Sequence, residues 1–193
     1  MVEQNWPLTW PIQLGDMELA LPLVRGGDGF QIYAFDLMGR GAWNVAAAEA
    51  LARRLALFDF DLLLCAESKS IALAERLSRL LGQDDYVVLR KSRKLYMADP
   101  LVVGVKSVTT TAPQQFFLGR DQQDLLRGKR VCVLDDVIST GGTLRAMHEV
   151  ARALRCDVIV NACVLTEEAA IEAFGGAPVV SLGHIPLPGV TVV

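Results

Sequence analysis

Hydrophobic and polar positions follow two alternating periods through the middle of the chain. Short apolar runs bounded by charged residues, glycine or proline predict buried strands at residues 62–66, 86–89, 131–134 and 158–165. Apolar residues that recur every three or four positions predict helices at residues 46–58, 71–81 and 144–154. A shorter helix over 167–174 and a last strand near Val179 complete the series. This order predicts an α/β fold with a doubly wound, mainly parallel sheet.

Two segments depart from this alternation. Residues 17–35 alternate around the glycine-rich stretch 25–29, which predicts a hairpin outside the main sheet. Residues 91–119 contain no helical pattern, and we expect an extended β-ribbon or a mobile loop there. We therefore predict one domain over residues 1–193, divided into a small N-terminal hood (1–42), a core (43–183) and a flexible loop (91–119).

Composition narrows the class of protein. Apolar residues make up 52% of the 193 positions, yet no run approaches the roughly 20 apolar residues that span a bilayer. Residues 1–13 lack the basic and apolar regions of a signal peptide, so we predict a cytoplasmic protein without a membrane partner. A net charge of −3 also argues against a protein that coats nucleic acid.

Cysteine and histidine give little support to metal chemistry. The four cysteines form no CxxC pair and have no neighbouring histidine, so we interpret them as reduced thiols, mostly in the core. His148 falls in a helical pattern and His184 in a C-terminal loop, and neither has an acidic or cysteine partner at metal spacing. We predict no metal site built from the protein's own residues.

The most informative segment follows the predicted strand 131–134. Asp135 and Asp136 end the strand, and a loop of small residues then leads into a helix. Backbone N–H groups at a helix start form a phosphate cradle, helped here by glycines and hydroxyls in Ser139, Thr140, Gly141, Gly142 and Thr143. Carboxylates would repel the phosphate but suit the hydroxyls of an attached sugar. The P-loop and dinucleotide motifs are both absent.

Residues 131–144 resemble the phosphoribosyl pyrophosphate (PRPP) signature of the type I phosphoribosyltransferases. The resemblance implies that Asp135 and Asp136 bind the ribose hydroxyls and that residues 139–143 surround the 5′-phosphate. It extends over residues 58–183, and the first 57 residues match only loosely.

Residues 66–70 resemble the pyrophosphate loop of that family. Ser68 and Lys69 would then contact pyrophosphate, with Lys69 in place of the arginine of adenine-type members; a lysine supplies charge but lacks the arginine fork. The resemblance also implies a cis peptide between residues 67 and 69. Taken alone, the segment fits an ordinary helix start equally well.

Arg90, Lys91 and Lys94 belong to a run of cations at the end of the second strand. Such runs are usually solvated, but these positions resemble the basic cluster that opens the mobile catalytic loop of the family. In its dimers, part of this cluster reaches the neighbouring subunit's pyrophosphate. The resemblance therefore implies a homodimer that binds PRPP.

The implied reaction is transfer of the 5-phosphoribosyl group from PRPP to a nucleobase with release of pyrophosphate. The base is expected to be a purine, as in purine salvage, because the chain most resembles the adenine and xanthine branch. Lys69 and Asp136 would be the catalytic residues, and Mg²⁺ would be held mainly by the substrate. Residues 100–120 contain no acid, although adenine-type loops usually carry a glutamate there. The base therefore stays open, as does a PRPP- or nucleotide-binding regulator with little catalysis. Hood aromatics could form a shelf for the base or belong to the core: Phe30, Phe35 and Trp43.

Overall fold

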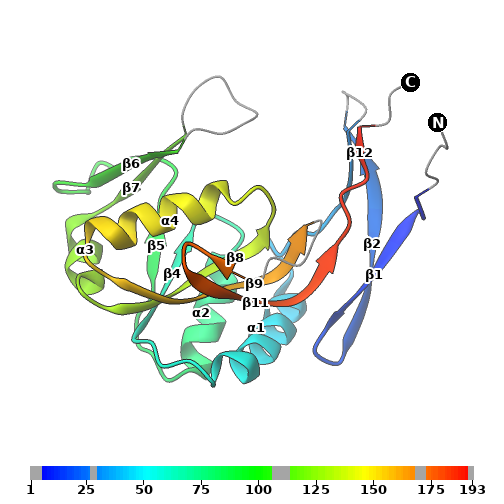
Figure 1. Ribbon diagram of the computed structural model, residues 1–193, viewed down its shortest axis with the longest axis horizontal. Coiled ribbons are helices and arrows are strands. Elements are labelled where there is room, and N and C mark those ends of the chain that lie inside the picture. Colours follow the sequence, from blue (N-terminus) through cyan, green and yellow to red (C-terminus); the bar gives the residue numbers. More distant parts are fainter. Residues whose placement is uncertain (1–5, 27–29, 106–113, 168–172, 191–193) are drawn as a thin grey trace.

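A six-stranded sheet runs through the centre of the protein (Figure 1). The computed structural model describes residues 6–26, 30–105, 114–167 and 173–190. The strand order is β10-β11-β9-β8-β4-β5, with bounds Ala173–Phe174, Ala177–Ile185, Asp157–Glu167, Arg130–Ile138, Leu62–Ala66 and Val87–Leu89. All neighbours pair in parallel except the short β10, which is antiparallel to β11. The predicted α/β fold is confirmed.

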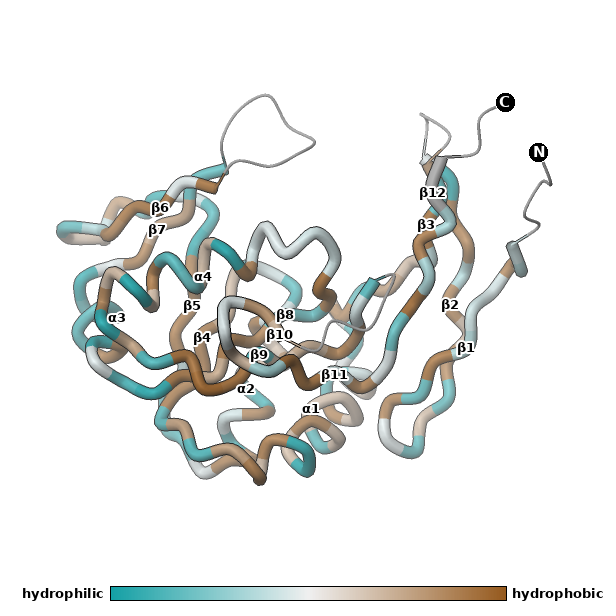
Figure 2. The backbone as a smooth tube through the Cα atoms, in the orientation of Figure 1, coloured by the Kyte–Doolittle hydropathy of each residue, from teal (hydrophilic) through white to brown (hydrophobic). Residues whose placement is uncertain are grey.

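Helices cover both faces of this sheet. One hydrophobic cluster joins the sheet to α1 (Gly41–Leu55) and α2 (Ile71–Leu80), and a second joins it to α3 (Arg120–Leu126) and α4 (Gly142–Ala153). Alternate strand residues feed the two clusters; Cys65 belongs to the first cluster and Leu64 to the second. Both faces of the strands are therefore apolar, as the brown central strands of Figure 2 show.

A smaller antiparallel sheet lies to one side, at the right of Figure 1. Its order is β1-β2-β3-β12, with bounds Thr9–Leu14, Met17–Arg25, Phe30–Tyr33 and Gly189–Val190. The predicted hairpin is confirmed by β2 and β3, although residues 27–29 at its tip lie outside the described residues. The sheet of the hood also contains β12, which lies near the C-terminus and pairs antiparallel with β3. The sequence pattern does not indicate this strand.

The predicted ribbon is formed by β6 (Leu101–Val105) and β7 (Gln114–Leu118), which pair antiparallel. Residues 106–113 lie outside the described residues. A two-way backbone bridge between Arg90 and Phe117 ties the ribbon to the end of β5. The extended form is confirmed, and the mobility of the segment stays a prediction.

The C-terminal third differs from the expected pattern in two places. The helix expected over 167–174 is wrong at both described ends, because Glu167 still belongs to β9 and residues 173–174 form β10; residues 168–172 lie outside the described residues. Gly175 and Gly176 have φ of +60° and +86°, and their turn folds β10 onto β11. His184 lies in β11 opposite Thr166 and not in a loop.

The cysteines are free thiols, and all but the half-buried Cys156 are buried. Burial raises the pKa of Cys65, Cys132 and Cys163, so these thiols stay neutral at physiological pH. In the described parts of the chain, no helix is both long and apolar enough to cross a membrane.

Candidate active site

The end of β8 leads through residues 139–141 into α4, as the motif predicts. No side chain among the described residues caps α4, and its first turn carries no acid. Its first backbone N–H groups can therefore donate to an anion. A cleft of about 180 Å³ opens over this loop, and Val105 and Gln114, which pair with each other at one end of the ribbon, also line it.

Gly141 fits this loop because of its conformation and its neighbour. Its φ of +72° lies in the left-handed region, and an added Cβ would approach Phe174 Cε2 to 2.8 Å. Phe174 belongs to β10, and its carbonyl accepts a 2.9 Å hydrogen bond from Asn161 Nδ2. The hairpin β10–β11 therefore packs against the cradle through the contact between Phe174 and Gly141.

Asp135 and Asp136 lie between the phosphate cradle of residues 139–143 and the loop of residues 67–70. The Asp135 carboxylate is buried, and its Oδ1 accepts hydrogen bonds from Ser70 Oγ (3.0 Å) and from the Asp136 backbone N–H (2.9 Å). Burial is the main reason why the pKa of Asp135 is raised, and the negative charge of Asp136 raises it further. The hydrogen bond from Ser70 opposes this rise and favours the ionised form.

A second cleft, of about 220 Å³, adjoins the first. It is lined by residues 67–70 and Lys91, and it shares Asp135, Val137 and Thr143 with the first cleft. The peptide bond between Glu67 and Ser68 is cis, in agreement with the implied pyrophosphate loop. The cradle, both carboxylates and the predicted residues Ser68 and Lys69 therefore form one continuous site.

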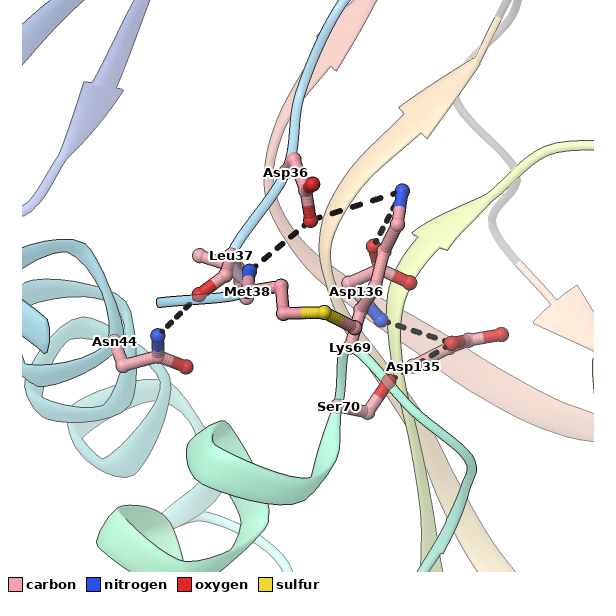
Figure 3. A network of polar contacts seen from close by, with 8 residues as sticks. All are labelled: Asp36, Leu37, Met38, Asn44, Lys69, Ser70, Asp135 and Asp136. Atoms are coloured by element: carbon pink, nitrogen blue, oxygen red, sulfur yellow. Dashed lines mark hydrogen bonds and ion pairs between the residues drawn. The ribbon is translucent and has the colours of Figure 1, made fainter. Parts of the chain in front are cut away.

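Lys69 reaches across this site between two acids (Figure 3). Its Nζ lies 3.9 Å from Asp136 Oδ2 and 4.0 Å from Asp36 Oδ1. Asp36 belongs to the connection between β3 and α1, and its Oδ1 also accepts a 3.0 Å hydrogen bond from the Met38 N–H. Asn44 Nδ2 donates 2.8 Å to the Leu37 carbonyl and anchors the same connection to α1.

The basic cluster is attached to the pyrophosphate loop through Glu67. Arg90 Nε forms an ion pair of 2.5 Å with Glu67 Oε1, and the Lys91 N–H donates 2.7 Å to Oε2. Lys94 Nζ instead donates to Ser92 Oγ at 2.7 Å. Lys91 lines the second cleft, whereas Arg90 and Lys94 line neither cleft in the described part of the protein. The binding roles of these three cations stay predictions.

Three residues of the site are not predicted from the sequence: Asp36, Glu67 as an anchor, and Ser70. Ser70 resembles a helix cap at the start of α2, but its hydroxyl turns to Asp135 instead. The aromatic shelf is not supported for two of its members, since Phe35 is buried and its ring stacks on Trp43 with centroids 6.0 Å apart. The alternation of residues 31–37 is the sequence signal that could have found Asp36, because it places Asp36 on the opposite side of the backbone from the buried Phe35.

The donor set suits a metal only in part. The described residues contain no group of three or more His, Cys, Asp or Glu that could hold an ion. Asp135 and Asp136 could supply some of the six oxygen ligands of Mg²⁺, and phosphate oxygens and water would supply the others. The residues present therefore fit a magnesium ion that arrives with a phosphorylated substrate.

Comparison with known proteins agrees with this geometry. Residues 44–174 match the family described as the phosphoribosyl transferase domain. The chain belongs to this family. It is 35% identical to an adenine phosphoribosyltransferase of Gluconobacter oxydans over 65% of its own length and 66% of that protein. It is also 35% identical to an adenine phosphoribosyltransferase of Gluconacetobacter diazotrophicus over 70% of each chain.

A hypoxanthine/guanine phosphoribosyltransferase of Methanosphaerula palustris is 32% identical over 61% of this chain and 60% of its own length. The matches thus span about two thirds of these curated relatives. A solved structure of adenine phosphoribosyltransferase from Thermoanaerobacter pseudethanolicus superposes with a TM-score of 0.71 at 21% identity. The superposition covers 86% of this chain and 95% of that chain, which confirms the fold.

Proposed function

We propose that this protein transfers the 5-phosphoribosyl group of PRPP to a purine base and releases pyrophosphate. One observation carries the proposal: the cradle of residues 139–143 and the loop of residues 67–70 open into adjoining clefts that share Asp135. PRPP carries phosphate groups on both sides of a ribose. Two anion-binding loops on either side of a pair of carboxylates match that arrangement.

Each part of the site has a task in the displacement. The C1–oxygen bond to pyrophosphate breaks with its electron pair going to the pyrophosphate oxygen, a bond from C1 to a ring nitrogen of the base forms, and the proton of that nitrogen passes to the released pyrophosphate or to water. The transition state resembles an oxocarbenium ion, as in glycoside transfer. Asp135 and Asp136 would accept hydrogen bonds from the ribose hydroxyls and stabilise positive charge near C1, while Lys69 and Lys91 would neutralise the pyrophosphate.

We propose that Mg²⁺ takes part as a complex with PRPP. When bound, it neutralises charge on the pyrophosphate oxygens as the leaving group departs. Asp135 and Asp136, which both line the second cleft, would reach the ion or its water shell. Residues 92–115 would close over the clefts and exclude water, a role supported by Val105 and Gln114, which line the first cleft.

A purine is the base we favour, because the relatives include both adenine and hypoxanthine/guanine phosphoribosyltransferases. The test is to incubate the protein with PRPP, Mg²⁺ and each common purine or pyrimidine, and to measure pyrophosphate release. Release with at least one purine is expected. If no base causes pyrophosphate release although the protein binds PRPP tightly, the result would instead support the second candidate, a PRPP-binding regulator of the same fold.

That second candidate is favoured by the lack of an acid in residues 100–120 and by the engagement of Lys69 with two carboxylates. We further propose a homodimer, supported by the exposed residues Lys91 and Arg93, of which Lys91 lines the second cleft, and a cytoplasmic location. Sedimentation at several protein concentrations tests the dimer, and cell fractionation tests the location.

A further inference from the structure

The connection between β3 and α1 presents one carboxylate to the site. Exposure alternates along this segment, with one side buried at Gln31, Tyr33, Phe35 and Leu37. Asp36 lies on the opposite, exposed side and points toward Lys69 (Figure 3). Since Asn44 fixes the backbone at Leu37, the direction of the Asp36 side chain is set by the packing of the hood on α1.

Lys69 is shared by carboxylates from two distant parts of the chain. Asp136 comes from the central sheet and Asp36 from the hood connection, and each lies about 4 Å from Nζ. The side chain of Asp136 is 12% exposed, whereas that of Asp36 is 59% exposed. Water can therefore solvate Asp36 at little cost when Lys69 leaves it, but Asp136 would be left in a poorly solvated position.

We propose that Asp36 is a competing counter-ion for Lys69, which weakens the binding of pyrophosphate at residues 67–70 and so favours release of the product. The inference rests on the proposed function. A polyanion at the loop must take Lys69 away from Asp36, and Asp36 recovers it when the polyanion departs. Asp36 lines neither cleft, so its effect on the ligand passes through Lys69.

The first test compares Asp36→Asn with the unchanged protein. An asparagine oxygen can still accept the hydrogen bond from the Met38 N–H, so the connection keeps its fold. We expect inorganic pyrophosphate with Mg²⁺ to bind about five-fold more tightly, because the competing charge near Nζ is gone. The inhibition constant for pyrophosphate should fall by the same factor, while KM for the base stays unchanged.

The second test repeats the substitution in a Lys69→Met background. If Asp36 acts through Lys69, the gain from Asp36→Asn disappears there, although both Lys69→Met proteins bind pyrophosphate weakly. Asp16→Asn is the matched control, because it removes the same charge from an exposed position in the turn between β1 and β2. This control should leave pyrophosphate binding and turnover as they are.

The outcomes separate the two proposals. Unchanged or weaker pyrophosphate binding in Asp36→Asn would overturn the counter-ion role, as would an equal gain in the Lys69→Met background. Turnover of PRPP would then leave the proposed function intact. A native protein that binds neither PRPP nor pyrophosphate would overturn the proposed function, and the counter-ion role with it.

Discussion

Ser70 Oγ donates a 3.0 Å hydrogen bond to Asp135 Oδ1 and so joins the start of α2 to the C-terminal half of β8. Both residues are buried, and the serine makes no capping hydrogen bond to its own helix. The bond crosses from the predicted pyrophosphate loop to the predicted ribose site. It therefore connects the two clefts at their shared wall.

Replacing Ser70 with alanine should make Asp135 harder to ionise. The hydrogen bond from Ser70 lowers the pKa of this buried carboxyl, so its loss raises the pKa further. We expect kcat/KM for PRPP at pH 7 to fall about two- to ten-fold, a loss of about 1 kcal/mol, and the deficit to narrow toward pH 9. The control is Ser78→Ala, a buried serine of α2 that donates to the Glu75 carbonyl and should leave the pH profile unchanged.

Asp135 should make the ligand-free protein less stable as the pH rises. Burial and Asp136 raise its pKa to about 7, above the value of about 4 in an unfolded chain. Between about pH 4 and 7 the folded protein therefore binds a proton that the unfolded chain has released, and the free energy of unfolding falls with rising pH. The Tm of Asp135→Asn relative to the unchanged protein should thus be higher at pH 8 than at pH 5. An equal difference at both values would contradict this.

Asp136→Asn tests the proposed ribose site directly. A neutral amide would lose the charge-assisted hydrogen bonds proposed for the ribose hydroxyls, so PRPP turnover should fall about 10- to 100-fold. Initial rates at varied PRPP measure the change. The same substitution at the exposed Asp84, outside both clefts, should leave the rates unchanged. An undiminished rate in Asp136→Asn would show that the motif assignment is wrong.

Gly141→Ala should destabilise the folded protein without any ligand present. The left-handed φ and the 2.8 Å approach of Phe174 both oppose a Cβ, and we expect a loss of about 1–3 kcal/mol. Gly142→Ala is the matched comparison, since an added Cβ there meets only Thr140 Oγ1 at 3.9 Å. Thermal unfolding of the two variants should differ by several degrees. Equal Tm values would contradict the role of Phe174.

The sequence predicts well those parts whose pattern is local. The apolar run 131–134 appears as a strand and the helix begins at Gly142 as expected, but β8 continues past Asp135 and Asp136 to Ile138 and does not end at the two acids. The basic segment and the loop at Ser68 also fall at strand ends, which meet at one edge of a parallel sheet.

The parts that escape prediction depend on contacts between distant residues. Asp36 looks like an ordinary surface acid until the hood packs on α1 and directs it to Lys69. The strand β12 is two residues long and exists only because β3 offers it an edge. The predicted helix at 167–174 fails because the Gly175–Gly176 turn and pairing with β11 outweigh local helix propensity at residues 173–174.

The two hydrophobic clusters on opposite faces of the sheet give the protein separable parts. Tyr33, Phe35 and Leu37 of the hood pack in one cluster, whereas Val105 and Phe116 of the ribbon and the helix behind the cradle pack in the other. Changes of stability made in the two clusters should therefore add. A protein engineer could therefore repack the hood around Tyr33 and Phe35 while the packing behind residues 139–143 stays unchanged.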